Sequence, residues 1–183
     1  MNWKKIRIIS RRLLTIWGGI SLLCLMIIIG YLYFWSLGNT NREDKAKKSD
    51  VRFVLNRCGL GDQRIDTVLK SYNSARLLLL GDHLDAYAIK ITGVTLKELA
   101  NEDNTTTGWY RMDSLPPILD EAVTFVNRWQ NTILWFPEEK RLRTKDFYVF
   151  PVSIYIVGLE PNGIELIFIN PDEKTVYYFS ASM

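Results

Sequence analysis

A long apolar stretch lies close to the N-terminus of the chain. No charged residue occurs from Leu13 to Asn41. About 20 apolar residues are enough to cross the hydrocarbon layer of a bilayer as a helix, whereas a soluble core helix of this length rarely lacks a polar face. The sequence therefore predicts one transmembrane helix over residues 13–36, in contact with the lipid bilayer.

Aromatic residues stand near both ends of this stretch. Trp17 lies near its start, and Tyr31, Tyr33 and Trp35 lie at its end. Amphipathic rings prefer the level of the lipid headgroups, where one part of the ring is apolar and another is hydrated. We therefore predict that these four residues lie at the membrane interface.

Other kinds of N-terminal segment fit this stretch less well. A cleaved secretory signal has a shorter apolar region with small residues before the cut, but here bulky aromatic residues precede Ser36 and Gly38. A lipoprotein anchor would need a small residue before its cysteine, and Leu23 precedes Cys24. Because no second charge-free segment of spanning length follows, we predict a single-pass signal anchor.

Basic residues on the two sides of the helix predict its orientation. Lys4, Lys5, Arg7, Arg11 and Arg12 precede it without an acidic residue, and Arg42, Lys45, Lys47 and Lys48 follow it among three acidic residues. Basic residues close to a span favour the cytoplasmic side, and Arg11 and Arg12 adjoin the helix. We expect residues 1–12 to form a cytoplasmic tail at the cell (inner) membrane. The C-terminal domain would then be extracytoplasmic, in the periplasm if the source is a bacterium.

The rest of the chain divides into a linker and one domain. Residues 37–49 are polar and mixed in charge, which is typical of a solvated linker, and residues 50–183 are enough for one domain with a core. Of the 23 basic residues, six lie in residues 1–42, which leaves 17 basic and 20 acidic residues in residues 43–183. This net charge of −3 gives no reason to expect nucleic acid as a partner.

Two short helices are predicted at the start of the domain, because four apolar positions at helical spacing define each one. These positions are Val51, Val54, Leu55 and Cys58 in the first helix and Ile65, Val68, Leu69 and Tyr72 in the second. Gly59 and Gly61 separate them. We expect a short helical hairpin.

Strand patterns follow. Arg76–Leu80 and Leu84–Thr92 flank Gly81, Asp82 and His83, which predicts two strands joined by a tight turn. Thr95 with Glu98 three residues later is a capping-box pattern that opens a short helix. A polar loop is expected over Asn101–Thr107.

The second half of the domain combines one strong helix with several strands. Pro117 suits the first turn of a helix whose apolar stripe is Leu119, Ala122, Val123, Val126 and Trp129, widened by Ile118 and Phe125.

We then expect strands at Ile133–Phe136, Val152–Leu159, Ile164–Asn170 and Thr175–Ser180, a charged loop at Glu138–Asp146, and turns at Pro161–Gly163 and Pro171–Lys174. Pro151 is expected to mark the start of its strand. The predicted class is α+β, with a mostly antiparallel sheet packed by helices on one face.

Asp82, His83 and Asp85 form the most reactive cluster in the sequence. His83 is the single histidine of the chain, and no ligand spacing supports a metal site. A polar turn between two strands explains the same residues without any chemistry. The three are therefore candidates for a catalytic site, and we predict no metal and no cofactor.

Cys58 could pair with His83 as a nucleophile and its base. However, Cys58 lies on an apolar helix face and at a helix C-terminus, where the helix field opposes a thiolate. The sequence contains no nucleophile elbow and no nucleotide-binding glycine loop. The residues thus favour a protein without catalysis.

Trp109, Tyr110 and Arg111 follow the polar loop directly, and aromatic residues beside an arginine are typical of protein-binding hot spots. We therefore predict them as a binding face, although core packing is the commoner fate of any one aromatic residue. The basic residues Lys140, Arg141, Arg143 and Lys145 could touch an acidic partner, but Glu138, Glu139 and Asp146 offset their charge.

These observations favour a membrane-anchored, non-catalytic domain that binds a protein partner, in an accessory, inhibitory or immunity-type role. An envelope enzyme with a site around Asp82, His83 and Asp85 is the alternative. A third possibility is a self-assembling scaffold, because Thr15 and Gly19 are spaced for close helix pairing. The sequence does not define the oligomeric state.

Overall fold

A computed structural model describes residues 3–38, 44, 46–74, 83–99 and 108–183. It divides into two compact units, residues 1–40 and 41–183, which are described separately. The predicted strand at Arg76–Leu80, the turn residues Gly81 and Asp82, and the predicted loop at Asn101–Thr107 lie outside the described residues.

The first unit contains one long helix, α1 (Trp3–Gly38), in which Leu14–Tyr33 has a mean hydropathy of 2.1 and no buried residue. Among the described residues, this is the one helix that is long and apolar enough to cross a membrane, a property that an anchor shares with a signal sequence. Trp17, Tyr31 and Tyr33 are exposed on it. The side chain of Trp35 lies outside the described part of the chain.

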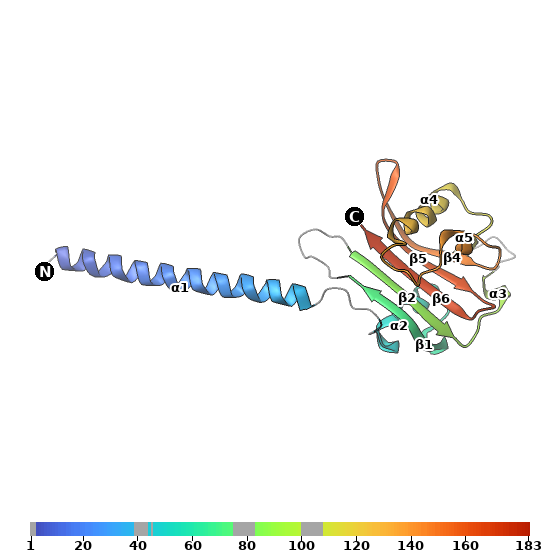
Figure 1. Cartoon of the computed structure of the whole chain (residues 1–183), viewed down its shortest axis with the longest axis horizontal. Coiled ribbons are helices and arrows are strands. Elements are labelled where there is room, and N and C mark those ends of the chain that lie inside the picture. The colour runs from blue at the N-terminus through green and yellow to red at the C-terminus, as the bar shows by residue number, and fades with distance from the viewer. Residues whose placement is uncertain (1–2, 39–43, 45, 75–82, 100–107) are drawn as a thin grey trace. The chain divides into compact units, whose positions relative to one another are not determined.

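The second unit is an α+β domain built on one antiparallel sheet (Figure 1). The strands are β1 (Ile65–Asn73), β2 (His83–Ile91), β3 (Tyr110–Arg111), β4 (Tyr148–Val157), β5 (Glu160–Asn170) and β6 (Thr175–Ser182), in the order β1-β2-β6-β5-β4-β3. The helices are α2 (Lys48–Arg57), η1 (Asp62–Arg64), α3 (Leu96–Leu99), α4 (Pro117–Val126), η2 (Asn127–Trp129) and α5 (Glu139–Leu142). The predicted α+β class and the C-terminal meander of three strands are confirmed.

Helices cover both faces of the sheet, and the prediction that they cover one face is wrong. Val54 and Leu55 of α2 share a core with Ile167, whereas Val123 of α4 shares the other core with Phe168. Figure 1 shows α2 and α4 on opposite sides of the sheet. Because β5 has consecutive buried apolar residues here, both of its faces require cover.

The predicted second helix is instead strand β1. Its register with β2 slips between Ile65 and Thr67, and again between Val68 and Lys70. A bulge inserts one residue, so residues on the same face lie three positions apart instead of two. Ile65 and Val68 therefore both pack against the core beneath α2, although their spacing is that of a helix.

Three further details differ from the prediction. The segment at Ile133–Phe136 forms turns, in which Ile133 and Phe136 are buried and Leu134 is exposed. The charged segment at Glu138–Asp146 contains the short helix α5. The turn between β4 and β5 lies at residues 158–159, not at Pro161–Gly163. The side-chain amide of Asn162 donates instead to the backbone carbonyl of Met183 at 2.6 Å.

Other local predictions are confirmed. The backbone and hydroxyl of Thr95 both donate to Glu98 Oε2, at 2.7 and 2.9 Å, and α3 follows. The predicted stripe of α4 is buried apart from the half-buried Trp129, while Ile118 is exposed.

The prediction that Pro151 marks the start of its strand is wrong, because β4 begins at Tyr148. Pro151 lies inside β4 beyond the two residues that pair with β3, close to a sheet edge that tolerates a missing N–H.

The chain reaches the domain before α2 begins. The amide of Asp44 donates to the carbonyl of Ser71 in β1 at 3.0 Å, and the amide of Ala46 donates to the Ser71 hydroxyl at 3.2 Å. Lys70 also forms an ion pair with Asp44. These contacts occupy part of the outer edge of β1, a strand that pairs with β2 on its other side.

Candidate functional site

One face of the sheet changes from apolar to polar along the strands. Beneath α2 this face presents Ile89, Ile167 and Val176. Toward the other end of the strands, the register places polar residues side by side from β1 across to β5. We call these six residues the His83 face: Asn73, His83, Asp85, Glu165, Ser180 and Ser182.

His83 lies between two serine hydroxyls. Its Nε2 atom is 2.8 Å from Ser180 Oγ, and its Nδ1 atom is 2.8 Å from Ser182 Oγ. A neutral imidazole donates from one nitrogen and accepts at the other, so one hydroxyl donates to the ring and the other accepts from it. Strand alternation explains the arrangement, because both serines are on β6 and His83 pairs with Ser182.

A second polar contact lies beside the first on the same face. The Tyr178 hydroxyl donates to Glu165 Oε1 at 2.7 Å, and Arg57 at the end of α2 forms an ion pair with Glu165. The guanidinium carbon of Arg57 is 5.1 Å from the centre of the Phe53 ring. Burial raises the pKa of Tyr178 to about 12, so Tyr178 remains a neutral donor near neutral pH.

The aromatic rings at the border of the His83 face hold these polar groups in place. Tyr87 and Tyr178 stack with centroids 5.6 Å apart, and Phe53 meets Tyr178 edge to face at 5.2 Å. Asn73 Nδ2 donates to the Tyr87 hydroxyl at 2.7 Å. The face therefore combines partly exposed asparagine, histidine, glutamate and serine groups with buried tyrosine, aspartate and serine groups on a rigid sheet, a chemistry suited to hydrogen-bonded recognition.

The structure tests the predicted cluster of Asp82, His83 and Asp85 only in part. His83 and Asp85 lie two residues apart on the same face of β2, and Asp85 is buried, while Asp82 lies outside the described residues. Sequence reasoning missed Ser180 and Ser182, whose contact with His83 depends on the register between β2 and β6. Within the described residues, no three His, Cys, Asp or Glu side chains are placed to hold a metal ion.

The three residues predicted as a binding face do not share one environment. Trp109 is buried and meets the Phe150 ring edge to face at 5.4 Å. Tyr110 is exposed, and Arg111 forms an ion pair with Asp113. Trp109 is therefore a core residue, and Tyr110 and Arg111 remain at the surface.

Cys58 is a buried core residue in the structure. Its thiol donates to the carbonyl of Leu55 at 3.4 Å, and burial raises its pKa to about 11. A thiol with this pKa carries little thiolate at neutral pH, which does not suit a nucleophile.

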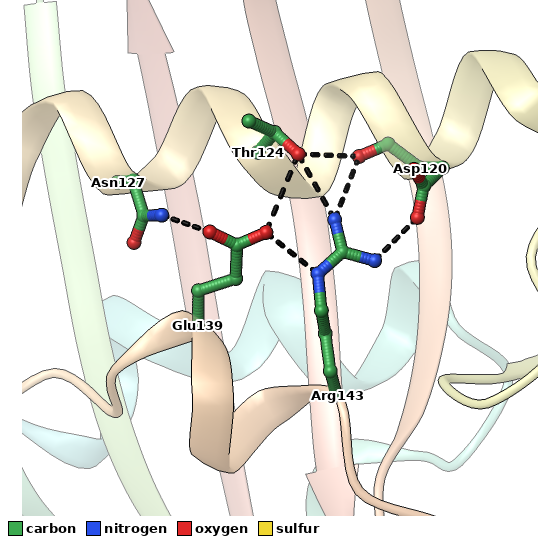
Figure 2. Close-up of polar contacts among 5 residues, drawn as sticks. All are labelled: Asp120, Thr124, Asn127, Glu139 and Arg143. Atoms are coloured by element: carbon green, nitrogen blue, oxygen red, sulfur yellow. Dashed lines mark hydrogen bonds and ion pairs between the residues drawn. The ribbon is translucent and has the colours of Figure 1, made fainter.

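Arg143, one of the basic residues near α5, joins two helices. Arg143 lies between Asp120 of α4 and Glu139 of α5 (Figure 2). Its Nε donates to Glu139 Oε1 at 2.6 Å, and its Nη1 contacts Asp120. Thr124 accepts from Arg143 Nη2 at 2.9 Å, and Asn127 contacts the second oxygen of Glu139. The charges of Asp120, Glu139 and Arg143 are all paired within this cluster, so the cluster has a structural role.

The tip of the β4–β5 hairpin is an exposed apolar surface. Tyr155, Ile156, Val157 and Leu159 are all exposed, with Leu159 at 93%. We call these four residues the hairpin tip. Figure 1 shows the hairpin extending past the neighbouring strands.

The fold and the site thus define an α+β protein with a partly polar sheet face. Comparison with protein-family models, curated proteins and solved structures found no match for the chain.

Proposed function

We propose that the chain is a single-pass membrane-anchored protein whose extracytoplasmic domain binds a protein partner through the His83 face, without catalysis. The observation that supports this most directly is the gathering of polar side chains from four strands on a sheet face whose other half is a core. Tyrosine and arginine are the side chains that protein interfaces use at their centres, and Tyr178 and Arg57 both contact Glu165 of this face.

Photocrosslinking of the full chain in its native membrane tests this proposal. Ser153 is exposed and pairs with Glu165, so a benzophenone amino acid at Ser153 lies beside the His83 face. Glu121, exposed on α4 against the opposite face of the sheet, is the matched control position. We expect a protein adduct of one defined mass from position 153 and none from position 121.

Substitutions in the face make the crosslinking result specific. His83→Ala and Ser182→Ala remove the hydrogen bonds of the ring and should weaken the adduct at position 153. An adduct that forms equally from position 121, or that ignores both substitutions, would contradict recognition by the His83 face.

An envelope enzyme is the second candidate function, and the contact between His83 and Ser180 favours it. A serine hydroxyl within hydrogen-bond reach of an imidazole is the pair that nucleophilic catalysis uses. A fluorophosphonate probe reacts with activated serines without knowledge of the substrate. Labelling that Ser180→Ala abolishes would establish the enzyme, whereas we expect no labelling of the intact chain.

The proposed orientation places the N-terminus in the cytoplasm and the domain outside it. Five basic residues before the apolar segment Leu14–Tyr33 and four after it support this direction by a small margin. An alkaline phosphatase fused after Met183 is active only outside the cytoplasm, so we expect activity. An inactive fusion, together with fluorescence from a green fluorescent protein at the same position, would reverse the orientation.

A further inference from the structure

The hairpin tip lies in a long segment without charge. The sequence from Phe147 to Leu159 contains no charged residue, and Tyr155, Ile156, Val157 and Leu159 expose apolar side chains side by side in the hairpin. An exposed apolar cluster of this kind marks a contact with a partner or a membrane.

The register fixes the end of the sheet at which the tip projects. Tyr155 pairs with Gly163, which pairs with Ser182, and Ser182 pairs with His83 at the start of β2. Beyond this row the hairpin continues to Val157 and Glu160, although β2 begins at His83 and β6 ends at Ser182. The tip therefore overhangs the end of the sheet at which β2 begins.

The segment before α2 is bound to β1. Asp44 bonds to Ser71, which lies two residues before Asn73 at the end of β1 and pairs with Tyr87 in the middle of β2. From Gly38, where α1 ends, to Asp44 there are six peptide steps, so a fully extended chain reaches about 20 Å. A tether of this length keeps the domain within reach of the bilayer that is proposed to hold α1.

The charges at the base of the tip also suit a lipid surface. Glu160, directly after the tip, forms an ion pair with Arg128 at 3.0 Å, so the first acidic group beyond the tip already has a basic partner. Tyrosine and aliphatic side chains together prefer the boundary between headgroups and hydrocarbon. Since the tether already restricts the domain to the bilayer surface, even weak insertion becomes populated.

We propose that the hairpin tip inserts into the headgroup region of the bilayer that holds α1, as a second membrane contact. This inference rests on the proposed anchoring of the chain by α1. It gives the domain one orientation on the membrane, with α3 and the turn between β5 and β6 at the end of the sheet farther from the lipid.

Spin labels on the full chain in phospholipid nanodiscs test this arrangement. Leu159→Cys and Leu96→Cys, each combined with Cys24→Ala, place one label at the tip and one on α3 at the opposite end of the sheet. Both leucines are exposed, so neither label disturbs a core, and buried Cys58 resists labelling. A third sample carries the label on native Cys24 within α1.

The readout is the collision rate of each label with oxygen, which concentrates in lipid, and with a water-soluble nickel complex. We expect oxygen to dominate at positions 24 and 159 and the nickel complex to dominate at position 96. If position 159 behaves like position 96 while position 24 remains rich in oxygen, the insertion is wrong and the anchor stands. If position 24 meets the nickel complex, the anchoring itself is wrong. A label at position 159 that is shielded from both reagents would indicate a protein contact and would also overturn the insertion.

Discussion

The guanidinium of Arg143 donates from Nε to the carboxylate of Glu139, one helical turn earlier, at 2.6 Å. The same guanidinium contacts Asp120 on α4, so one side chain joins two helices that pack on one face of the sheet (Figure 2). Three charges that hold one another in place form a network, which is worth more than an isolated surface pair.

The first prediction concerns this network. Arg143→Met keeps the apolar stem but removes the hydrogen bonds, and should lower the free energy of unfolding by about 1 kcal/mol. Arg141→Met is the matched control, because Arg141 makes only an exposed pair with Glu173 and should cost roughly a few tenths of a kcal/mol. Urea unfolding of both variants followed by tryptophan fluorescence measures the difference. Equal losses would show that the link between α4 and α5 adds nothing.

A second prediction follows from the capping box of α3. The Arg64 guanidinium, together with the Thr95 amide, lowers the pKa of Glu98 from 4.5 to about 2. Because the folded-state pKa is depressed, this stabilisation is complete above the unfolded-state pKa and is lost as the pH falls through about 2. Glu98→Gln should therefore destabilise the protein at pH 7, by on the order of 1 kcal/mol because the pair is partly exposed.

The pH dependence provides the control for Glu98. The difference between wild type and Glu98→Gln should shrink as the pH falls from 4.5 to 2, because the wild-type carboxylate becomes protonated over this range. A constant difference across that range would assign the effect to side-chain shape instead of charge.

The third prediction concerns Gly108, which precedes the buried Trp109. Gly108 has φ +67°, and a Cβ atom there would lie 2.8 Å from the Phe150 ring, which already packs against Trp109. Gly59 has a similar φ of +77° with no atom within 4 Å of the same position. Gly59→Ala should cost about 1 kcal/mol from backbone strain alone, and Gly108→Ala about 1–3 kcal/mol more from the clash. Thermal unfolding of the two variants separates these causes, and equal shifts would show that Phe150 moves aside freely.

The sequence predicted the elements whose pattern is purely local. Helix α2, the capping box at Thr95 and the C-terminal meander depend on neighbouring residues, and the structure confirms them. Strand β1 was mistaken for a helix because two bulges give its apolar residues a spacing of three. The sequence did not predict helices on both faces of the sheet, because the segment Leu166–Ile169 is apolar throughout and shows no alternation of apolar and polar residues.

The candidate site shows the same limit. The sequence singled out His83 because it is the only histidine, but its partners Ser180 and Ser182 lie almost one hundred residues away along the chain. Strand register brings them together, and no local spacing contains that information. The exposed hairpin tip was read as part of an ordinary strand, since apolar residues in a strand normally face a core.

The last prediction uses the two cysteines, which should both resist a membrane-impermeant maleimide in intact membranes, for different physical reasons. Cys58 is buried in the domain core, and its pKa of about 11 leaves little thiolate at pH 7. Cys24 is exposed on α1, so the bilayer alone would protect it.

Urea that unfolds the domain should expose Cys58 while Cys24 remains unreacted, and detergent should then expose Cys24. Mass spectrometry after each step counts the modified thiols on the full chain, and Cys24→Ala and Cys58→Ala assign them. Reaction of Cys24 before detergent would falsify the placement of α1 in the membrane, whereas early reaction of Cys58 would show that the core beneath α2 opens readily.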